Sequence, residues 1–192
     1  VELIAPCFYD FHENAFLPML LMWFFYAVEK KKYVLMYIMT ALLLIVKEDV
    51  SIYMVLLGLF CIFRLEKRYH GAVITGFSGV YFVVVTRLME KYGEGVFTSR
   101  TYGNLMTDQS ASFGNIIKTV ITDPMYFITQ CVDEKDFKLM LIIMIPLFFL
   151  PFVTKHFSHY FLLAPFILMN LAPGYGYAYD YGFQYVFGTT TC

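Results

Sequence analysis

The chain has 192 residues, of which 59% are hydrophobic, 20% are aromatic and only 15% are charged, and its formal net charge at pH 7 is -1. Soluble domains carry roughly 25% charged residues, and a soluble fold of this length has too little interior to hide so much apolar surface. The composition therefore predicts a membrane protein with membrane lipid as a partner. No basic stripe with interleaved aromatic residues is present, which excludes nucleic acid as a partner.

The first residues, from Val1, contain neither an initiator methionine nor a signal-peptide pattern. We therefore expect residues 1–192 to form a single integral-membrane domain that is a piece of a longer chain. The four cysteines, at positions 7, 61, 131 and 192, have no C-x-x-C spacing, so the sequence gives no support for a zinc site. Cys61 lies in an apolar run, which predicts a buried thiol.

Apolar runs predict an all-α fold, a polytopic bundle of about six transmembrane helices. The runs cover residues 14–28, 33–46, 50–63, 71–88, 139–153 and 160–171. Several are shorter than the roughly 20 residues that a perpendicular span requires. Pro18 predicts a kink in the first helix, an irregularity that membrane helices tolerate beside neighbours or a cavity.

The charged triplet Lys47-Glu48-Asp49 separates two of these runs. One helix over residues 33–63 would be about 46 Å long and would need a tilt near 50° to fit roughly 30 Å of hydrocarbon, outside the usual range. The triplet therefore predicts a hairpin of two short helices, whose tip sinks below the headgroups because each arm is only about 21 Å long. The alternative is a solvated turn in which Lys47 pairs with a neighbouring carboxylate, although no Gly, Pro or Asn is present to form a tight turn.

Basic residues flank both ends of this hairpin. Lys30, Lys31 and Lys32 precede it, and Arg64, Lys67 and Arg68 follow it. Short connections rich in Lys and Arg remain cytoplasmic, so both ends of the hairpin are expected inside and its tip outside. The pattern predicts a multi-pass protein of the plasma membrane.

The longest polar connection, residues 89–137, falls on the external side of this topology. Ile116, Ile117, Val120 and Ile121 recur at helical spacing within it, which predicts a helix lying on the outer leaflet. Ordered loops of this length usually carry function.

Polar residues on the external side are the candidate site residues. Asp10-Phe11-His12-Glu13 matches a capping box, yet His12 adds an imidazole able to ligate a metal or carry a proton. A charged side chain at membrane depth costs roughly 2.5–3.5 kcal/mol, so Glu48 and Asp49 are expected to have a functional role. The tyrosine-rich residues 175–185 are typical of an interfacial aromatic belt, but Asp180 and Gln184 within them favour a loop that contacts sugar or headgroups.

The order and spacing of these motifs resemble the bacterial predicted membrane proteins of domain-of-unknown-function family 2079. The resemblance is carried by Asp10-Phe11-His12-Glu13, Pro18, Lys30-Lys31-Lys32, Lys47-Glu48-Asp49 and the aromatic segment from Tyr179 to Tyr185. It implies a helical fold related to the GT-C glycosyltransferases, which take sugars from polyprenyl-phosphate carriers at the external face. The acidic pair that such enzymes place in their first external loop would precede Val1.

Sugar transfer requires a base for the acceptor hydroxyl and positive charge near the departing phosphate. Five residues are candidates for the base, some of them also able to ligate a divalent cation: Asp10, His12, Glu13, Glu48 and Asp49. Six residues are candidates for substrate contacts: Lys47, Arg100, Tyr179, Asp180, Gln184 and Tyr185.

Two other classes of protein remain open. One is an ion-coupled transporter, in which Glu48, Asp49 and His12 form a proton or cation pathway, and the other is a non-catalytic membrane scaffold. Transporters place polar groups at both mouths or midway along several spans, whereas here they gather on one side, which favours an enzyme.

Overall fold

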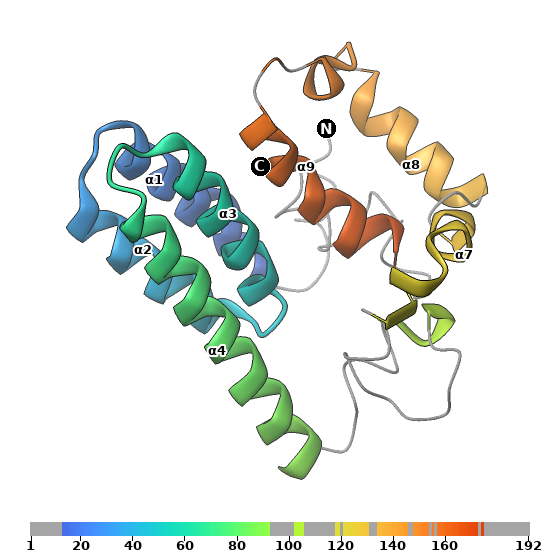
Figure 1. The fold of residues 1–192 in the computed structure, drawn as a ribbon, viewed down its shortest axis with the longest axis horizontal. Coiled ribbons are helices and arrows are strands. Elements are labelled where there is room, and N and C mark those ends of the chain that lie inside the picture. Colours follow the sequence, from blue (N-terminus) through green and yellow to red (C-terminus); the bar gives the residue numbers. More distant parts are fainter. Residues whose placement is uncertain are drawn as a thin grey trace.

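The computed structural model describes residues 13–92, 102–105, 118–119, 121–130, 134–145, 148–153, 155, 157–172 and 174, and these contain helices and no strand (Figure 1). The α-helices are α1 (Leu17–Glu29), α2 (Tyr33–Val46), α3 (Val50–Arg64), α4 (Tyr69–Tyr92), α7 (Pro124–Gln130), α8 (Glu134–Met144) and α9 (Tyr160–Phe166). Short 3₁₀ turns cover Glu13–Phe16, Gly103–Leu105, Leu150–Phe152 and Phe157–His159, and a π-helix covers Ile167–Leu171. The all-α prediction is confirmed for this part of the chain.

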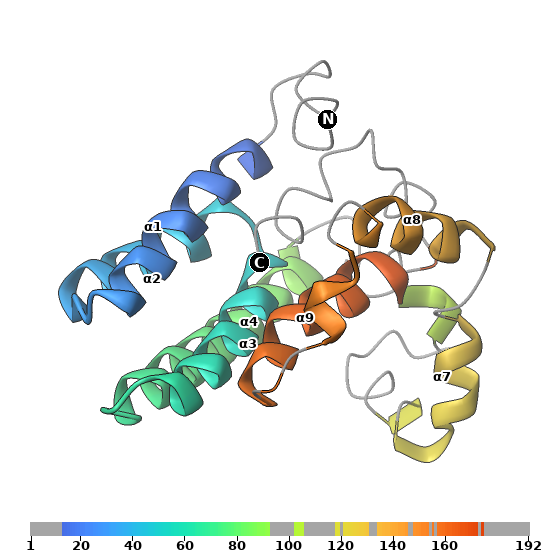
Figure 2. The ribbon, with the colours of Figure 1, turned by 90° about the horizontal axis from the view of Figure 1, so that it is seen from above.

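Helices α1 to α4 form two packed layers, with α1 on α2 and α3 on α4 (Figure 2). Helix α9 lies against α3, while α7 and α8 lie farther out (Figures 1 and 2). Helix α2 ends at Val46 and α3 begins at Val50, so the predicted division of this region into two short helices is confirmed.

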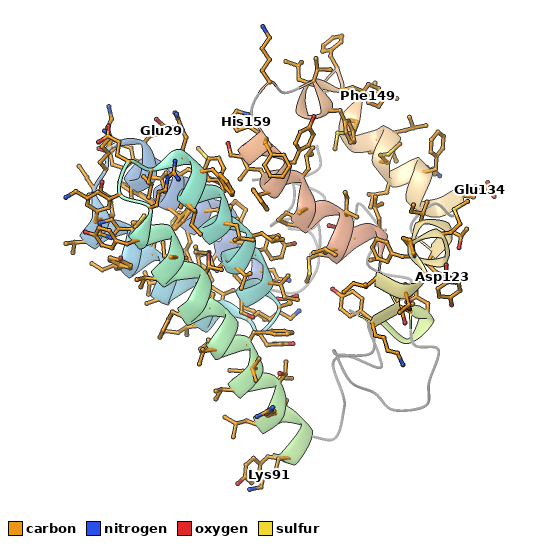
Figure 3. The ribbon with its side chains drawn as sticks, in the orientation of Figure 1. Glu29, Lys91, Asp123, Glu134, Phe149 and His159 are labelled. Carbon is orange, nitrogen blue, oxygen red and sulfur yellow. The ribbon has the colours of Figure 1, made fainter. Side chains whose placement is uncertain are left out.

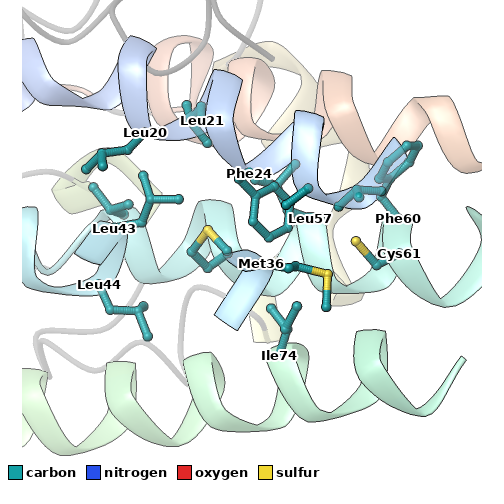
Figure 4. Packing of buried hydrophobic residues seen from close by; sticks show 14 of the residues in the cluster. Leu20, Leu21, Phe24, Met36, Leu43, Leu44, Leu57, Phe60, Cys61 and Ile74 are labelled. Atoms are coloured by element: carbon teal, nitrogen blue, oxygen red, sulfur yellow. The ribbon is translucent and has the colours of Figure 1, made fainter. Parts of the chain in front are cut away.

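The core lies between these layers (Figure 4). Leu21 and Phe24 of α1 meet Met36 and Leu43 of α2, and Leu57 of α3 closes the cluster; each is at most 1% exposed. Cys61 is also fully buried, with a free thiol, as its apolar surroundings predict.

Helices α3 and α4 approach each other closely at small residues. A Cβ atom placed on Gly71 would lie 2.5 Å from the backbone nitrogen of Ile62 and 2.8 Å from the carbonyl oxygen of Gly58. A Cβ on Gly58 would lie 2.7 Å from the backbone nitrogen of Thr75. Small residues that let backbones touch are the usual means of packing helices in membranes.

The basic clusters of the two connections lie together. The exposed ion pairs Lys31–Glu66, at 2.6 Å, and Arg64–Glu29, at 2.8 Å, join the α1–α2 connection to the end of α3. The two ends of the α2–α3 unit are therefore adjacent, and we call this region of Lys30, Lys31, Lys32, Arg64, Lys67 and Arg68 the basic end.

Only α4, among the described helices, is long and apolar enough to cross a membrane by itself. Its candidate span, Tyr69–Met89, has 21 residues and a mean hydropathy of 1.7, and 11% of its most apolar window is buried in the structure. The segments Tyr33–Val46, Val50–Arg64 and Phe157–Leu171 are apolar but shorter. The structure therefore supports a helical protein with one clear span, and the six-span arrangement is not established by it.

Prolines account for three differences from the expected helices. Pro18 lies in the first turn of α1, after a 3₁₀ turn, where its missing N–H costs little, so the predicted kink is wrong. The run 139–153 is not one helix, because α8 ends at Met144 and a 3₁₀ turn containing Pro151 follows. Pro165 interrupts the hydrogen bonding of α9, which continues as the π-helix Ile167–Leu171.

Candidate functional site

The Lys47-Glu48-Asp49 triplet forms a compact turn between α2 and α3. Lys47 is extended, with φ -161° and ψ 155°, which stops α2, and Asp49 occupies the N-cap of α3. Backbone N–H groups of Val50 and Ile52 donate to the carbonyls of Lys47 and Asp49, at 3.2 and 3.0 Å. The Ser51 hydroxyl donates to the carbonyl of Glu48, so side-chain and backbone hydrogen bonds hold this turn without Gly or Pro.

Asp49 is buried at this turn, with 6% of the residue exposed. Its Oδ2 atom lies 3.8 Å from the Lys47 ammonium nitrogen, and its Oδ1 atom has no hydrogen-bond partner among the described residues. The charges of Lys47, Glu48 and Glu13 act on this carboxylate. Its unpaired oxygen can accept a hydrogen bond or a proton from a bound molecule.

Residues from three parts of the chain interact electrostatically at Asp49. The charge of Glu13, at the start of the first 3₁₀ turn, acts on Asp49, and the charge of Asp49 acts on Tyr102. Glu48 is adjacent to Asp49 and half-buried. We call the region of Glu13, Lys47, Glu48, Asp49 and Tyr102 the carboxylate end.

Tyr102 and Asn104 connect their segment to the π-helix and to the residues that follow it through hydrogen bonds. The Tyr102 hydroxyl donates to the Leu168 carbonyl at 3.0 Å. The Asn104 amide donates to the Ala172 carbonyl at 3.1 Å, and its Oδ1 accepts the Gly174 N–H at 2.9 Å. Sequence reasoning missed both residues, because their partners lie 66 to 70 positions away and leave no local pattern.

Helix α7 attaches to the same segment. The Tyr126 hydroxyl donates to the Asn104 carbonyl at 2.6 Å, and Asp123 Oδ1 accepts the Tyr126 N–H at 3.0 Å, which caps the helix. Ile121, Met125 and Ile128 are more than half exposed at spacings of four and three residues. Of the residues on which the predicted interfacial helix rests, Ile116, Ile117 and Val120 lie outside the described part of the chain, so the helix stays a prediction.

The carboxylate end lies deep relative to α4. Helices α3 and α4 are joined at the basic end by Leu65–Arg68, and their lengths of 15 and 24 residues correspond to about 22 and 36 Å. Lys91, near the far end of α4, lies opposite Glu29 along the bundle (Figure 3). Asp49, at the start of α3, therefore lies about 14 Å short of the far end of α4.

The remaining candidate residues lie outside the described part of the chain. These are Asp10, His12, Arg100, Tyr179, Asp180, Gln184 and Tyr185. Among the residues that the structure describes, no group of three or more His, Cys, Asp or Glu side chains is placed to hold a metal ion.

The described residues form helices and no strand, and they include one apolar helix that is long enough to cross a membrane, as in an α-helical membrane protein. A model of one family, described as predicted membrane protein (DUF2079), matches residues 2–189. The chain belongs to this family, which confirms the resemblance seen in its motifs. No curated protein and no solved structure matches the chain.

Proposed function

We propose that this protein is a GT-C-like glycosyltransferase that moves a sugar from a polyprenyl-phosphate carrier to an acceptor hydroxyl at the carboxylate end. The observation that carries the proposal is the position of Asp49, a buried carboxyl with one oxygen lacking a described hydrogen-bond partner. A general base needs an oxygen within hydrogen-bond reach of the proton that it removes.

The surrounding groups suit the same reaction. Asp49 Oδ1 accepts the proton of the acceptor hydroxyl while the hydroxyl oxygen attacks the anomeric carbon, and the bond between that carbon and the carrier phosphate breaks. Lys47 lies 3.8 Å from the other carboxylate oxygen and supplies positive charge for the departing phosphate. Glu13 and Glu48 are the further carboxylates of this end.

The recessed position of Asp49 also suits a lipid-linked donor. A polyprenyl chain lies in the hydrocarbon and its phosphate lies near the interface, so a base below the headgroups meets the sugar without drawing the carrier out of the bilayer. The external orientation follows from the basic end being cytoplasmic.

The test is sugar transfer by the full-length protein in vesicles supplied with a polyprenyl-phosphate-linked sugar. Glu48→Gln with Asp49→Asn keeps side-chain size while removing charge, and the rate should fall on the order of 10²-fold or more. Glu29→Gln with Glu66→Gln removes the same two charges at the basic end and should transfer at close to the parental rate. Undiminished transfer by the first variant would remove Glu48 and Asp49 from the mechanism.

Ion-coupled transport is the second candidate, favoured by the same buried carboxyl. A buried carboxyl beside other charged side chains is typical of the proton pathways of membrane carriers. Solute uptake driven by a proton gradient, lost in Asp49→Asn and occurring without any sugar transfer, would replace the glycosyltransferase proposal with this one.

A further inference from the structure

The basic end carries more positive charge than its own carboxylates neutralise. Glu66 and Glu29 pair with Lys31 and Arg64, which leaves four cations without an ion pair to a described carboxylate: Lys30, Lys32, Lys67 and Arg68. All four are exposed. Lys30 and Lys32 come from the α1–α2 connection and Lys67 and Arg68 from the α3–α4 connection, and the two ion pairs hold these connections side by side.

Aromatic rings fix two of these cations in place. The Lys32 ammonium lies 5.0 Å from the centre of the Tyr26 ring and donates to its hydroxyl at 3.2 Å. The Lys67 ammonium lies 5.7 Å from the centre of the Tyr33 ring. Trp23 packs edge-on against Tyr26 and is half exposed. Aromatic rings of this kind mark the level of the headgroups in a membrane protein.

Lys31 has a backbone conformation that lysine adopts less readily than some other residues do. Lys31 has φ 53°, a left-handed conformation that glycine or asparagine adopts more readily at the end of a helix. The N–H of Lys31 donates to the Val28 carbonyl and the N–H of Lys32 to the Ala27 carbonyl, at 3.1 and 2.8 Å, which closes α1. This sharp turn places three consecutive lysines beside the α3–α4 connection.

We infer that the basic end is a binding surface for anionic phospholipid headgroups of the membrane in which the protein lies. The phosphate of such a lipid fits four exposed cations at headgroup level, and its acyl chains fit the apolar outer face of α4, on which Val73, Phe77 and Val80 are more than half exposed. Clusters of four to eight cations beside a membrane helix attract anionic lipid electrostatically. The interaction lies at the opposite end of the bundle from the carboxylates and does not depend on sugar transfer.

The test compares spin-labelled phosphatidylglycerol with spin-labelled phosphatidylcholine at the full chain in phosphatidylcholine vesicles, at low and at high salt. The unmodified protein should immobilise the anionic lipid preferentially at low salt, and salt should reduce this preference. Lys30→Gln, Lys32→Gln, Lys67→Gln and Arg68→Gln together should lower the preference about fivefold or more, the factor that one lost cation at a charged surface corresponds to.

The matched control replaces four exposed cations elsewhere, Arg87, Lys91, Lys118 and Lys138, by glutamine and should retain the preference. If the fourfold variant at the basic end does not fold, the pairs Lys30→Gln with Lys32→Gln and Lys67→Gln with Arg68→Gln are measured separately, and each should lose part of the preference. No preference in the unmodified protein, or an equal loss in the control, overturns the inference.

Discussion

Replacing Gly71 by alanine should destabilise the bundle, because α4 has no room for a Cβ atom there. The three nearest atoms would be backbone atoms of α3, the nitrogen of Ile62 at 2.5 Å, the oxygen of Gly58 at 2.8 Å and the carbonyl carbon of Cys61 at 2.9 Å. Heavy atoms in contact normally lie about 3.5–4.0 Å apart, so the helices must separate by about 1 Å. Backbone atoms have no alternative rotamer with which to avoid the clash.

The change in the free energy of unfolding depends on the cost of overpacking and on the gain in helix propensity. Overpacking of this kind costs about 1–3 kcal/mol, and a gap approaching 1 Å along the contact forfeits a quarter to a half of the dispersion energy of the separated atoms. Alanine gains about 1 kcal/mol of helix propensity over glycine. Gly76, on the same helix, has nothing within 4 Å of the position of its Cβ, so Gly76→Ala gains the propensity without the clash. Both variants gain this propensity, so it cancels in the comparison, and Gly71→Ala should be about 1–3 kcal/mol less stable than Gly76→Ala.

Reversible unfolding in mixed detergent micelles, followed by circular dichroism, measures this difference. Gly79→Ala provides a second control. Its Cβ would lie 3.9 Å from a methyl group of Val55, which is an ordinary contact, so this variant should be as stable as Gly76→Ala. Equal stability of the Gly71 and Gly76 variants would show that α3 and α4 are not in backbone contact at this point.

Three further predictions concern Asp49, Asn104 and the membrane topology. The buried Asp49 carboxylate has one oxygen without a described hydrogen-bond partner, so Asp49→Asn should raise the unfolding free energy at pH 7.5 by about 1–3 kcal/mol in denaturant titrations. An unchanged unfolding free energy would contradict this reasoning. Asn104→Ala removes the acceptor of the Gly174 N–H and the donor to the Gln130 side chain of α7, so amide hydrogen exchange should become faster at Gly174 and at the end of α7, whereas equal exchange would contradict a role of these bonds. In a cysteine-free background, a membrane-impermeant thiol reagent should label Glu13→Cys but not Lys30→Cys in intact cells, and the reverse result would invert the topology.

Sequence alone predicts the α2–α3 unit because its signals are local. Charged residues end both apolar runs, and the observed helices Tyr33–Val46 and Val50–Arg64 match these limits within one residue. The later runs predict the helix ends less well. The apolar composition of a stretch that contains proline does not show whether a helix continues through it. Helix α8 thus begins before its apolar run and ends within it.

The candidate site is predictable only in part. The alternation of short helices places Glu13 and Asp49 at one end, and their electrostatic interaction agrees with that placement. Tyr102 is invisible to such reasoning, because its burial depends on the Leu168 carbonyl, which is 66 residues distant. Long-range contacts of this kind depend on how helices pack, and the spacing of residues along the chain does not predict that packing.

The energetics of Asp49 separate a chemical role from a structural one. A buried carboxylate whose ion-pair partner lies 3.8 Å away and whose second oxygen lacks a described hydrogen bond is costly at neutral pH, and asparagine would fill the same space without charge. A scaffold gains nothing from that cost, whereas a base or proton carrier requires it, and such sites commonly sacrifice stability for function. An Asp49→Asn protein that is more stable at pH 7.5 yet inactive would place Asp49 in the mechanism. A variant both more stable and fully active would leave its charge without a chemical role and favour the scaffold.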